Sequence, residues 1–248
     1  MIKIKTKEEI DKIAQAGKIL AKISNTLKKS IKPGITTGEL DQLAQNEFQR
    51  FDVVSAFKGY RGFPAHICCS VNEEVVHGIP NGRKLQDGDL LSIDLGIKLD
   101  GYYADAAFTQ AVGNKIKPNI KKLINVTRQA LSKGINQARI NKRISDISSA
   151  IQGYVESSGF SVVREFVGHG IGRELHEEPQ IPNFGKPNTG ELITEGMVFA
   201  IEPMVNMGSW QVDILENGWT AVTKDKMPSC HFEHTVAVLK DGPVILTQ

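Results

Sequence analysis

Long apolar runs and a cysteine framework are both missing from this sequence of 248 residues. No apolar run approaches the roughly 18 residues of a membrane-spanning helix, so we expect no transmembrane segment. The N-terminal segment MIKIKTKEEIDKI has no apolar core and carries acids early, unlike a signal peptide. Cys68, Cys69 and Cys230 form neither a disulfide framework nor a Cys-x-x-Cys motif. A reducing compartment, and so the cytoplasm, fits this pattern.

The sequence also has no large excess of either charge, because its 30 Lys and Arg residues nearly balance its 28 Asp and Glu residues. A net charge of +2 is too small to indicate membrane or specific nucleic-acid binding. The pairs Lys28-Lys29 and Lys121-Lys122 could lie near a polyanion, although solvated helix faces are the commoner role for such pairs. The apolar content of 40% is that of a globular protein. We expect one domain over residues 1–248.

Helical periodicity and end signals predict four helices. A capping box formed by Thr6 and Glu9 begins the first, which should stop before Pro33-Gly34. We expect Thr37 to cap the second helix, Pro118 to begin a third that ends near Ala138, and Ser145 to cap a fourth that ends at Ser158.

Strand patterns follow each pair of helices. The predicted strands are Ile67–Val71, Phe160–Val167, Met197–Glu202, Gln211–Leu215, Ala221–Thr223 and Ser229–Leu239, while 72–84 reads as irregular. Each half of the chain therefore reads as two helices followed by strands. Two such halves could pack as one domain with helices outside a shared curved sheet, which gives the fold class α/β (α+β).

A β-hairpin stands at the centre of the sequence, with arms Leu90–Ile97 and Tyr102–Val112 and a turn at Asp100-Gly101. This turn places Asp94 opposite Ala107, with Asp105 as its diagonal neighbour on the same face. A turn at Leu99-Asp100 would instead place the two aspartates directly opposite. Like charges so arranged are tolerated if they face water, share a proton or hold a cation.

Further acids and histidines occur in unusual positions. Glu202 ends the apolar strand MVFAI, so we expect it to be partly buried. Glu233 follows His231 on one strand face, whereas His234 reads as a half-buried, hydrogen-bonded side chain. The segment GHGIGRELHEEP contains His169, His176 and three closely spaced glycines. The glycines predict a loop whose backbone can come close to another group. The two glutamates of the segment, 177 and 178, read as surface acids. His77, in HGIP, is ambiguous between a loop histidine and a site residue.

Four carboxylates from these segments would carry too much charge to be buried without partners. Two divalent cations would neutralise it, and carboxylates with imidazole suit Mn, Fe(II), Co or Zn. Two such ions can hold a hydroxide nucleophile.

Five segments, HGIP, IDLGIKLDGYYAD, GHGIGRELHEEP, FAIEPM and FEHTVAV, resemble those of the bacterial type I methionine aminopeptidases. The resemblance covers essentially the whole chain. It implies the pita-bread (creatinase/aminopeptidase) fold, with a curved, mostly antiparallel sheet and helices on its outer face. The pseudo-two-fold arrangement of this fold agrees with the order of elements.

The resemblance also implies roles for individual residues. The dimetal ligands would be Asp94, Asp105, His169, Glu202 and Glu233, with Asp105 and Glu233 bridging the metals. Glu202 would act as general base, and His77 and His176 would contact the substrate on either side of the scissile bond. The pocket for the methionine side chain would include Tyr60, Phe63, Cys68, Leu175, Met204 and Trp219, and a monovalent cation would bind near Asn72, Glu74 and Ser229.

The implied activity is removal of the initiator methionine from nascent chains when the second residue is small. A hydroxide held by the two metals would attack the scissile carbonyl, one metal would bind the free α-amine, and a formyl group would block cleavage. The implied partners are nascent peptides and the ribosome surface, and we expect a cytoplasmic monomer.

Three alternatives remain. Xaa-Pro aminopeptidases and dipeptidases share the fold, but their last glutamate usually stands in an Arg-x-Glu-Asp context, unlike Phe232-Glu233-His234 here. A non-catalytic peptide- or ribosome-binding relative would usually have lost ligands. A cysteine hydrolase using Cys68 or Cys69 lacks a recognisable nucleophile turn. Type II methionine aminopeptidases differ in another way, because the interval from Glu202 to Glu233 leaves no room for their helical insertion.

Overall fold

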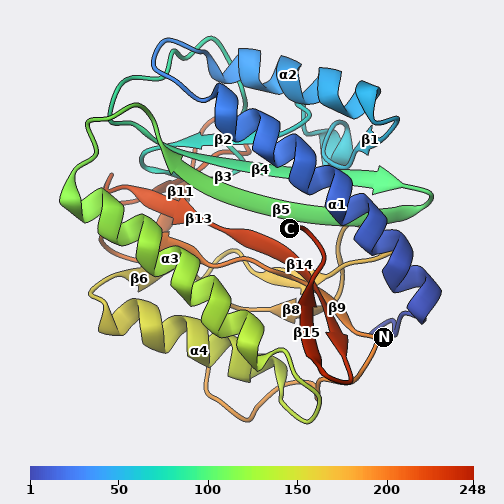
Figure 1. Cartoon of the computed structure of the whole chain (residues 1–248). Helices are drawn as coiled ribbons and strands as arrows, with labels where there is room; N and C mark the ends of the chain where they lie inside the picture. The colour runs from blue at the N-terminus through green and yellow to red at the C-terminus, as the bar shows by residue number, and fades with distance from the viewer.

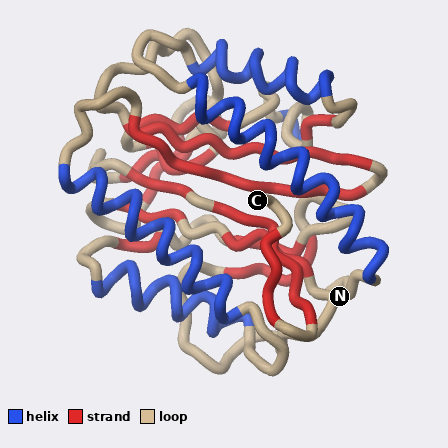
Figure 2. Tube along the Cα trace, viewed as in Figure 1, coloured by secondary structure: helices blue, strands red, loops and turns tan.

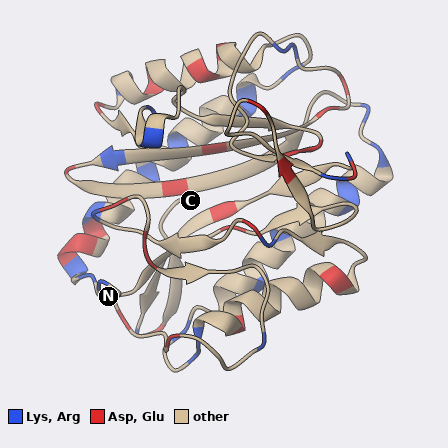
Figure 3. Cartoon of the chain, turned by 180° about the vertical axis from the view of Figure 1, so that it is seen from behind, with Lys and Arg blue, Asp and Glu red and all other residues tan.

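The main sheet has nine strands, and four helices cover one of its faces in a computed structural model that describes residues 1–248 (Figures 1 and 2). The helices are α1 (Lys7–Ser30), α2 (Thr37–Arg50), α3 (Pro118–Gln137) and α4 (Ile144–Ser157). They form two pairs, α1 with α2 and α3 with α4, on the viewer's side of Figure 1. The other face carries no α-helix (Figure 3). No helix is long and apolar enough to cross a membrane.

The main sheet is antiparallel throughout, and its central path runs β1-β4-β5-β14-β9-β7-β8, with β2 beside β4 and β15 beside β14. These strands are β1 (Val54–Ser55), β2 (Cys68–Val71), β4 (Leu90–Leu99), β5 (Tyr102–Ala111), β7 (Gly168–Gly170), β8 (Glu177–Ile181), β9 (Val198–Ile201), β14 (Glu233–Leu239) and β15 (Gly242–Ile245).

Two three-stranded sheets and a short 3-10 helix complete the fold. The first sheet contains β6 (Ser161–Val162), β10 (Met204–Asn206) and β13 (Ser229–His231), and the second contains β3 (Glu74–Val76), β11 (Val212–Ile214) and β12 (Ala221–Thr223). The 3-10 helix η1 spans Tyr60–Gly62.

The two halves of the chain meet in the main sheet along a short seam between β5 and β14. Only two residue pairs form this seam, Glu233 with Ala107 and His234 with Ala106. The hydroxyl of Thr235 extends it, because it accepts the Asp105 N–H at 2.9 Å and donates to the Asp105 carbonyl at 2.8 Å. The seam thus crosses the sheet beside two of the predicted metal ligands.

The predicted hairpin register is confirmed. Leu99 pairs with Tyr102 and Asp94 pairs with Ala107, so Asp105 is the diagonal neighbour of Asp94. Asp100 and Gly101 have φ values of 48° and 84°, which a two-residue turn of the Asp-Gly type requires.

Two helix caps were predicted one or two residues too late. The N-cap of α2 is Thr36, which forms a capping box with Glu39, and not Thr37. The N-cap of α4 is Arg143, and not Ser145. The hydroxyl of Ser145 instead bonds to the backbone of Thr189, donating at 2.6 Å and accepting at 2.7 Å. A long-range contact has replaced the local cap.

Several strand predictions were also incomplete. The segment 160–167 holds only the two-residue β6, and the strand predicted over 229–239 is broken at Phe232. The segment 72–84 was predicted to be irregular but contains β3, and the glycine-rich segment contains the strands β7 and β8 rather than a loop alone. Between α-helices and sheet, a continuous core of 45 buried apolar residues holds these elements in place.

Candidate active site

The five predicted metal ligands converge on one cavity of about 170 Å³. Asp94 lies on β4 and Asp105 on β5, while Glu233 begins β14 across the seam. His169 lies on β7, and Glu202 directly follows β9. Acidic positions are visible on the long central strands of the helix-free face in Figure 3. Each half of the chain therefore contributes one wall of the site.

Local backbone features aim these side chains at the cavity. The register of β7 with β8 shifts between His169 and Gly170, and such irregularities commonly re-aim a side chain beside a site. The ring of His169 is held by a contact of 2.9 Å between its Nδ1 and the Gly170 carbonyl, which leaves Nε2 free to face the acids. Gly96, opposite Asp105 in the hairpin, has no room for a side chain because Phe57 and Ala56 approach it.

The carboxylates destabilise one another's ionised forms. Burial, joined by the charge of Glu202, raises the pKa of Asp94 to about 7. Burial and the charge of Asp94 raise the pKa of Asp105 well above its usual value. Burial does the same to the pKa of Glu202, and burial with the charge of Asp105 raises that of Glu233. Without a cation, this site holds protons that free carboxyl groups would release.

The histidines are held neutral in the same region. Burial lowers the pKa of His169 to about 4, and burial with the neighbouring His231 lowers that of His77 to about 4. Nε2 of His169 lies 3.5 Å from Oε1 of Glu202, and Nε2 of His231 lies 3.6 Å from Oε2 of the same glutamate. Neutral imidazoles are the form that ligates metals.

The donor set fits divalent metal ions. Three buried atoms have no hydrogen-bond partner: Oδ1 of Asp94, Oε1 of Glu233 and Nε2 of His231. Two groups of side chains bring their donor atoms within 4.8 Å of one another, Asp105 with His169 and Glu233, and Glu202 with His231 and Glu233. Oxygen-rich sets with one imidazole suit Mn, Fe, Co and Zn, and a cation would satisfy the unpartnered atoms.

The metal-free protein should lose stability as the pH rises from 6.5 to 8. In this interval the site carboxyls keep protons in the folded state that unfolded carboxyls have already lost, so the free energy of unfolding falls. The histidines oppose this trend at the lower end of the interval and below it, because unfolded histidines gain protons that the folded ones resist, namely His77, His169, His176, His231 and His234. Denaturant unfolding of metal-free protein at both pH values measures the fall.

Asp94→Asn is the matched variant for this measurement, because it removes one of the titrating carboxyls and should make the fall smaller. A metal-free protein whose stability is constant or rises between pH 6.5 and 8 contradicts the prediction.

His77 and His176 line the same cavity as the acids. Nδ1 of His176 lies 2.9 Å from the Tyr60 hydroxyl, and its ring stands 4.2 Å from that of His169. His77 has a left-handed φ of 58° and packs edge-on against Phe166 and Trp219. Histidine is among the non-glycine residues that adopt this left-handed conformation more often than most. The two histidines therefore flank the acid cluster from different loops.

Four of the six residues predicted to bind the methionine side chain line the cavity: Tyr60, Phe63, Cys68 and Trp219. Phe63 and Trp219 meet edge to face at 5.1 Å. Leu175 is buried in the apolar cluster around Phe63, and Met204 is buried with Val75 and Val163, so neither lines the cavity. Burial raises the pKa of the Cys68 thiol well above its usual value, which makes it unreactive.

The three residues predicted to bind a monovalent cation lie close together. The Ser229 N–H donates to the Asn72 carbonyl at 2.9 Å, and Glu74 accepts the Val71 N–H at 2.8 Å. The Asn72 amide is occupied within the protein, because it donates to Asp89 and accepts from the Leu90 N–H.

Sequence reasoning missed two residues that line the cavity, Phe57 and Arg61, and one buried histidine next to it. His231 is buried beside Glu202, and its position two residues before Glu233 on one strand face was a usable signal.

The prediction that Glu177 is a surface acid was wrong. Its carboxylate is buried and pairs with Lys5 at 2.6 Å, and it also accepts the backbone N–H groups of Arg173 and Glu174. This glutamate anchors the loop that carries His176. The prediction for His234 was correct, since it is half-buried and its Nδ1 lies 2.9 Å from the Thr247 hydroxyl.

Two comparisons define the class of protein. Residues 11–240 match metallopeptidase family M24, and the chain belongs to this family. Its fold is that of a prolidase from Pyrococcus furiosus, with a TM-score of 0.81 at 23% identity over 99% of this chain and 65% of the other. The chain is therefore a metallopeptidase with the pita-bread fold, which confirms the predicted fold.

Relatives with higher sequence identity indicate which kind of metallopeptidase the chain resembles. The chain is 53% identical to "Methionine aminopeptidase 1" of Bacillus subtilis over the full length of both. It also superimposes on the crystal structure of methionine aminopeptidase from Thermotoga maritima with a TM-score of 0.98, at 47% identity and complete coverage of both chains. The predicted resemblance to the methionine aminopeptidases is confirmed.

Proposed function

We propose that this protein removes the N-terminal methionine from nascent peptides whose second residue is small. The observation that carries the proposal is the convergence of five metal-ligating side chains with His77 and His176 in one cavity of about 170 Å³ with aromatic walls. The full-length similarity to methionine aminopeptidases supports the choice of substrate.

The metal centre would hold two divalent ions (Mn, Fe(II), Co or Zn), and the residues that would hold them are Asp94, Asp105, His169, Glu202 and Glu233. When bound, these ions supply Lewis-acid activation of water and of the scissile carbonyl. Oδ1 of Asp94 and Oε1 of Glu233, buried without partners, support this assignment. A monovalent cation near Asn72, Glu74 and Ser229 would have a structural role.

The chain's own residues would then move protons and hold the peptide. Glu202, whose pKa burial raises, would take the proton of the attacking water as general base. His176, oriented by Tyr60, would donate a hydrogen bond to the carbonyl oxygen as negative charge develops there. His77, on the opposite loop, would contact the nitrogen of the leaving group.

The substrate's first residue would fit the aromatic end of the cavity. Tyr60, Phe63, Cys68 and Trp219 supply apolar surface for a thioether side chain, which packs well against aromatic rings. The free α-amine would lie at the acid cluster, so a formyl group on this amine would prevent binding. Leu175 and Met204 would support this pocket from behind its wall.

The whole chain, residues 1–248, would act as one catalytic domain and as a monomer in the cytoplasm. Its substrate emerges from the ribosome, and we propose that the enzyme works at the ribosome surface.

The direct test is release of methionine from a Met-Ala-Ser peptide. Purified enzyme should release methionine, a chelator should abolish release, and Mn, Fe(II) or Co added back should restore it. The same assay on formyl-Met-Ala-Ser should give no product, and a peptide with a large second residue should react far more slowly. Absence of release with every metal would contradict the proposal.

A panel of Xaa-Pro peptides and elemental analysis test the alternatives. Preferential cleavage of Xaa-Pro bonds would identify a proline-specific peptidase instead. Protein that binds no divalent metal would indicate a non-catalytic relative.

A further inference from the structure

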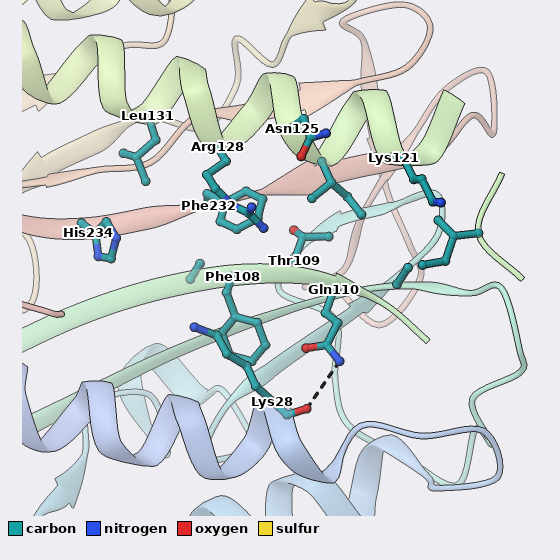
Figure 4. Close-up of a pocket in the computed structure, with 14 residues that line it drawn as sticks. Lys28, Phe108, Thr109, Gln110, Lys121, Asn125, Arg128, Leu131, Phe232 and His234 are labelled. Atoms are coloured by element: carbon teal, nitrogen blue, oxygen red, sulfur yellow. Dashed lines mark hydrogen bonds between the residues drawn. The ribbon is translucent and has the colours of Figure 1, made fainter. Parts of the chain in front are cut away.

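A second, larger cavity of about 610 Å³ lies on the helix-covered side of the sheet (Figure 4). Its floor is formed by β5 and the start of β14, and α1 and α3 form its two sides. It shares no lining residue with the candidate active site, which lies on the other face of the same strands. We refer to this cavity as the helix groove.

Positively charged side chains reach into the helix groove from both α1 and α3. Nζ of Lys28, on α1, lies 4.6 Å from the centre of the Phe108 ring, and the guanidinium of Arg128, on α3, lies 5.2 Å from that of Phe232. Lys121 also lines the groove and lies on α3, closer to its N-terminus than Arg128 (Figure 4). Two aromatic rings of the floor thus hold two of the three cations in place.

No anion balances these charges. None of the residues lining the helix groove is Asp or Glu, and Lys28, Lys121 and Arg128 take part in no ion pair. Every charged residue in the segments 12–38 and 106–145, which include the two flanking helices, is Lys or Arg, although the whole chain has a net charge of only +2. Burial, and then the charge of Arg128, lower the pKa of Lys28, as expected for a cation that lacks a counter-charge.

The remaining lining suits a ligand with several acceptor oxygens. The side-chain amides of Asn125 and Gln110 face the groove, and that of Gln110 donates to the Lys28 carbonyl at 3.4 Å (Figure 4). The volume is within the range of small-molecule sites, about 300–1,000 Å³. The cations converge on one cavity instead of forming a line along the surface, which favours a compact ligand over a nucleic-acid strand.

We propose that the helix groove binds a small anion that carries several phosphate groups, which contact Lys28, Lys121 and Arg128, and ATP serves as its probe. Planar guanidinium and ammonium donors approaching from two sides are the usual means of holding a chain of phosphates.

The test uses the metal-loaded enzyme and calorimetric titration with the magnesium complex of ATP. Saturable binding is expected, and Lys28→Met and Arg128→Gln should each weaken it by about tenfold or more, because each removes a charge-assisted contact. Matched controls are Lys29→Gln, adjacent to Lys28 but exposed, and Lys133→Gln, on α3 but directed at Tyr154; both should change affinity by less than about twofold. Arg128 is exposed, so its variant should fold even if that of Lys28 does not.

Asp105→Asn separates the helix groove from the metal centre. It should keep full ATP affinity, since Asp105 lies on the other side of the sheet. Affinity unchanged by Lys28→Met and Arg128→Gln, or lost in Asp105→Asn, would overturn the proposal. Binding of a 12-nucleotide single-stranded RNA with the same dependence on Lys28 and Arg128, but no binding of ATP, would also overturn it and assign the groove to an RNA backbone.

Discussion

Asp105→Asn should abolish most of the peptidase activity and most of the metal content together. The asparagine Oδ1 can still accept the Ala106 N–H that Asp105 accepts at 3.0 Å, so the fold should persist. What is lost is the negative charge of a proposed metal ligand. Loss of groups that merely orient metal ligands already costs about 10–100-fold, so we expect a decrease in kcat of more than about 100-fold. Methionine release and elemental analysis measure both effects.

Asp100→Asn is the matched control in the same hairpin. Asp100 is exposed at the turn with φ of 48°, a conformation that asparagine adopts readily, so activity and metal content should stay unchanged. An Asp105→Asn enzyme with normal turnover and normal metal content would show that the hairpin aspartates do not form the metal site.

Gly168→Ala should destabilise the protein and weaken metal binding, although it replaces no proposed ligand. A Cβ at this position would lie 2.4 Å from the Ala200 carbonyl oxygen, which belongs to the neighbouring strand β9. The strand β7 would have to move away, and His169 would move with it. Such overpacking costs about 1–3 kcal/mol, which for a chain of this size lowers Tm by roughly 2–12 °C. Thermal unfolding and a metal titration give the two readouts.

Gly153→Ala provides the control for this substitution. Gly153 lies on the exposed face of α4 with no neighbour near its Cβ position, so alanine should raise stability by about 0.5–1 kcal/mol. If Gly168→Ala were as stable as the original protein and bound metal equally well, the close approach of β7 to β9 would not determine where His169 lies.

Local chemistry explains which parts of the fold were predictable. The hairpin register follows from an Asp-Gly turn and period-two alternation, both of which are readable within a few residues. The capping box at Thr6 was correct for the same reason, since Glu9 completes it three residues later. Ser145 failed as a cap because its hydroxyl bonds to Thr189, a partner far along the chain.

Long-range partners explain what was missed at the site. Glu177 reads as exposed in its local segment, and only the fold brings Lys5 against it. The glycines beside His169 were predicted to allow a close backbone approach, and the approaching atoms are the carbonyl oxygens of Ala200 and Glu178. That those glycines lie in a strand could not be predicted, because the pairing of β7 with β9 depends on Ala200, which lies far along the chain.

Because the seam between β5 and β14 is narrow, metal binding would also affect how firmly the two halves of the chain are held together. Asp94 and Asp105 belong to the first half of the chain, and the other three proposed ligands belong to the second, while only two residue pairs join the halves there. Ions bound across this seam would act as a removable cross-link, so their binding free energy would also count as cohesion between the halves. Such ions would add to the contacts that already join the halves elsewhere, among them the pairing of β3 with β12 and the ion pair between Lys5 and Glu177.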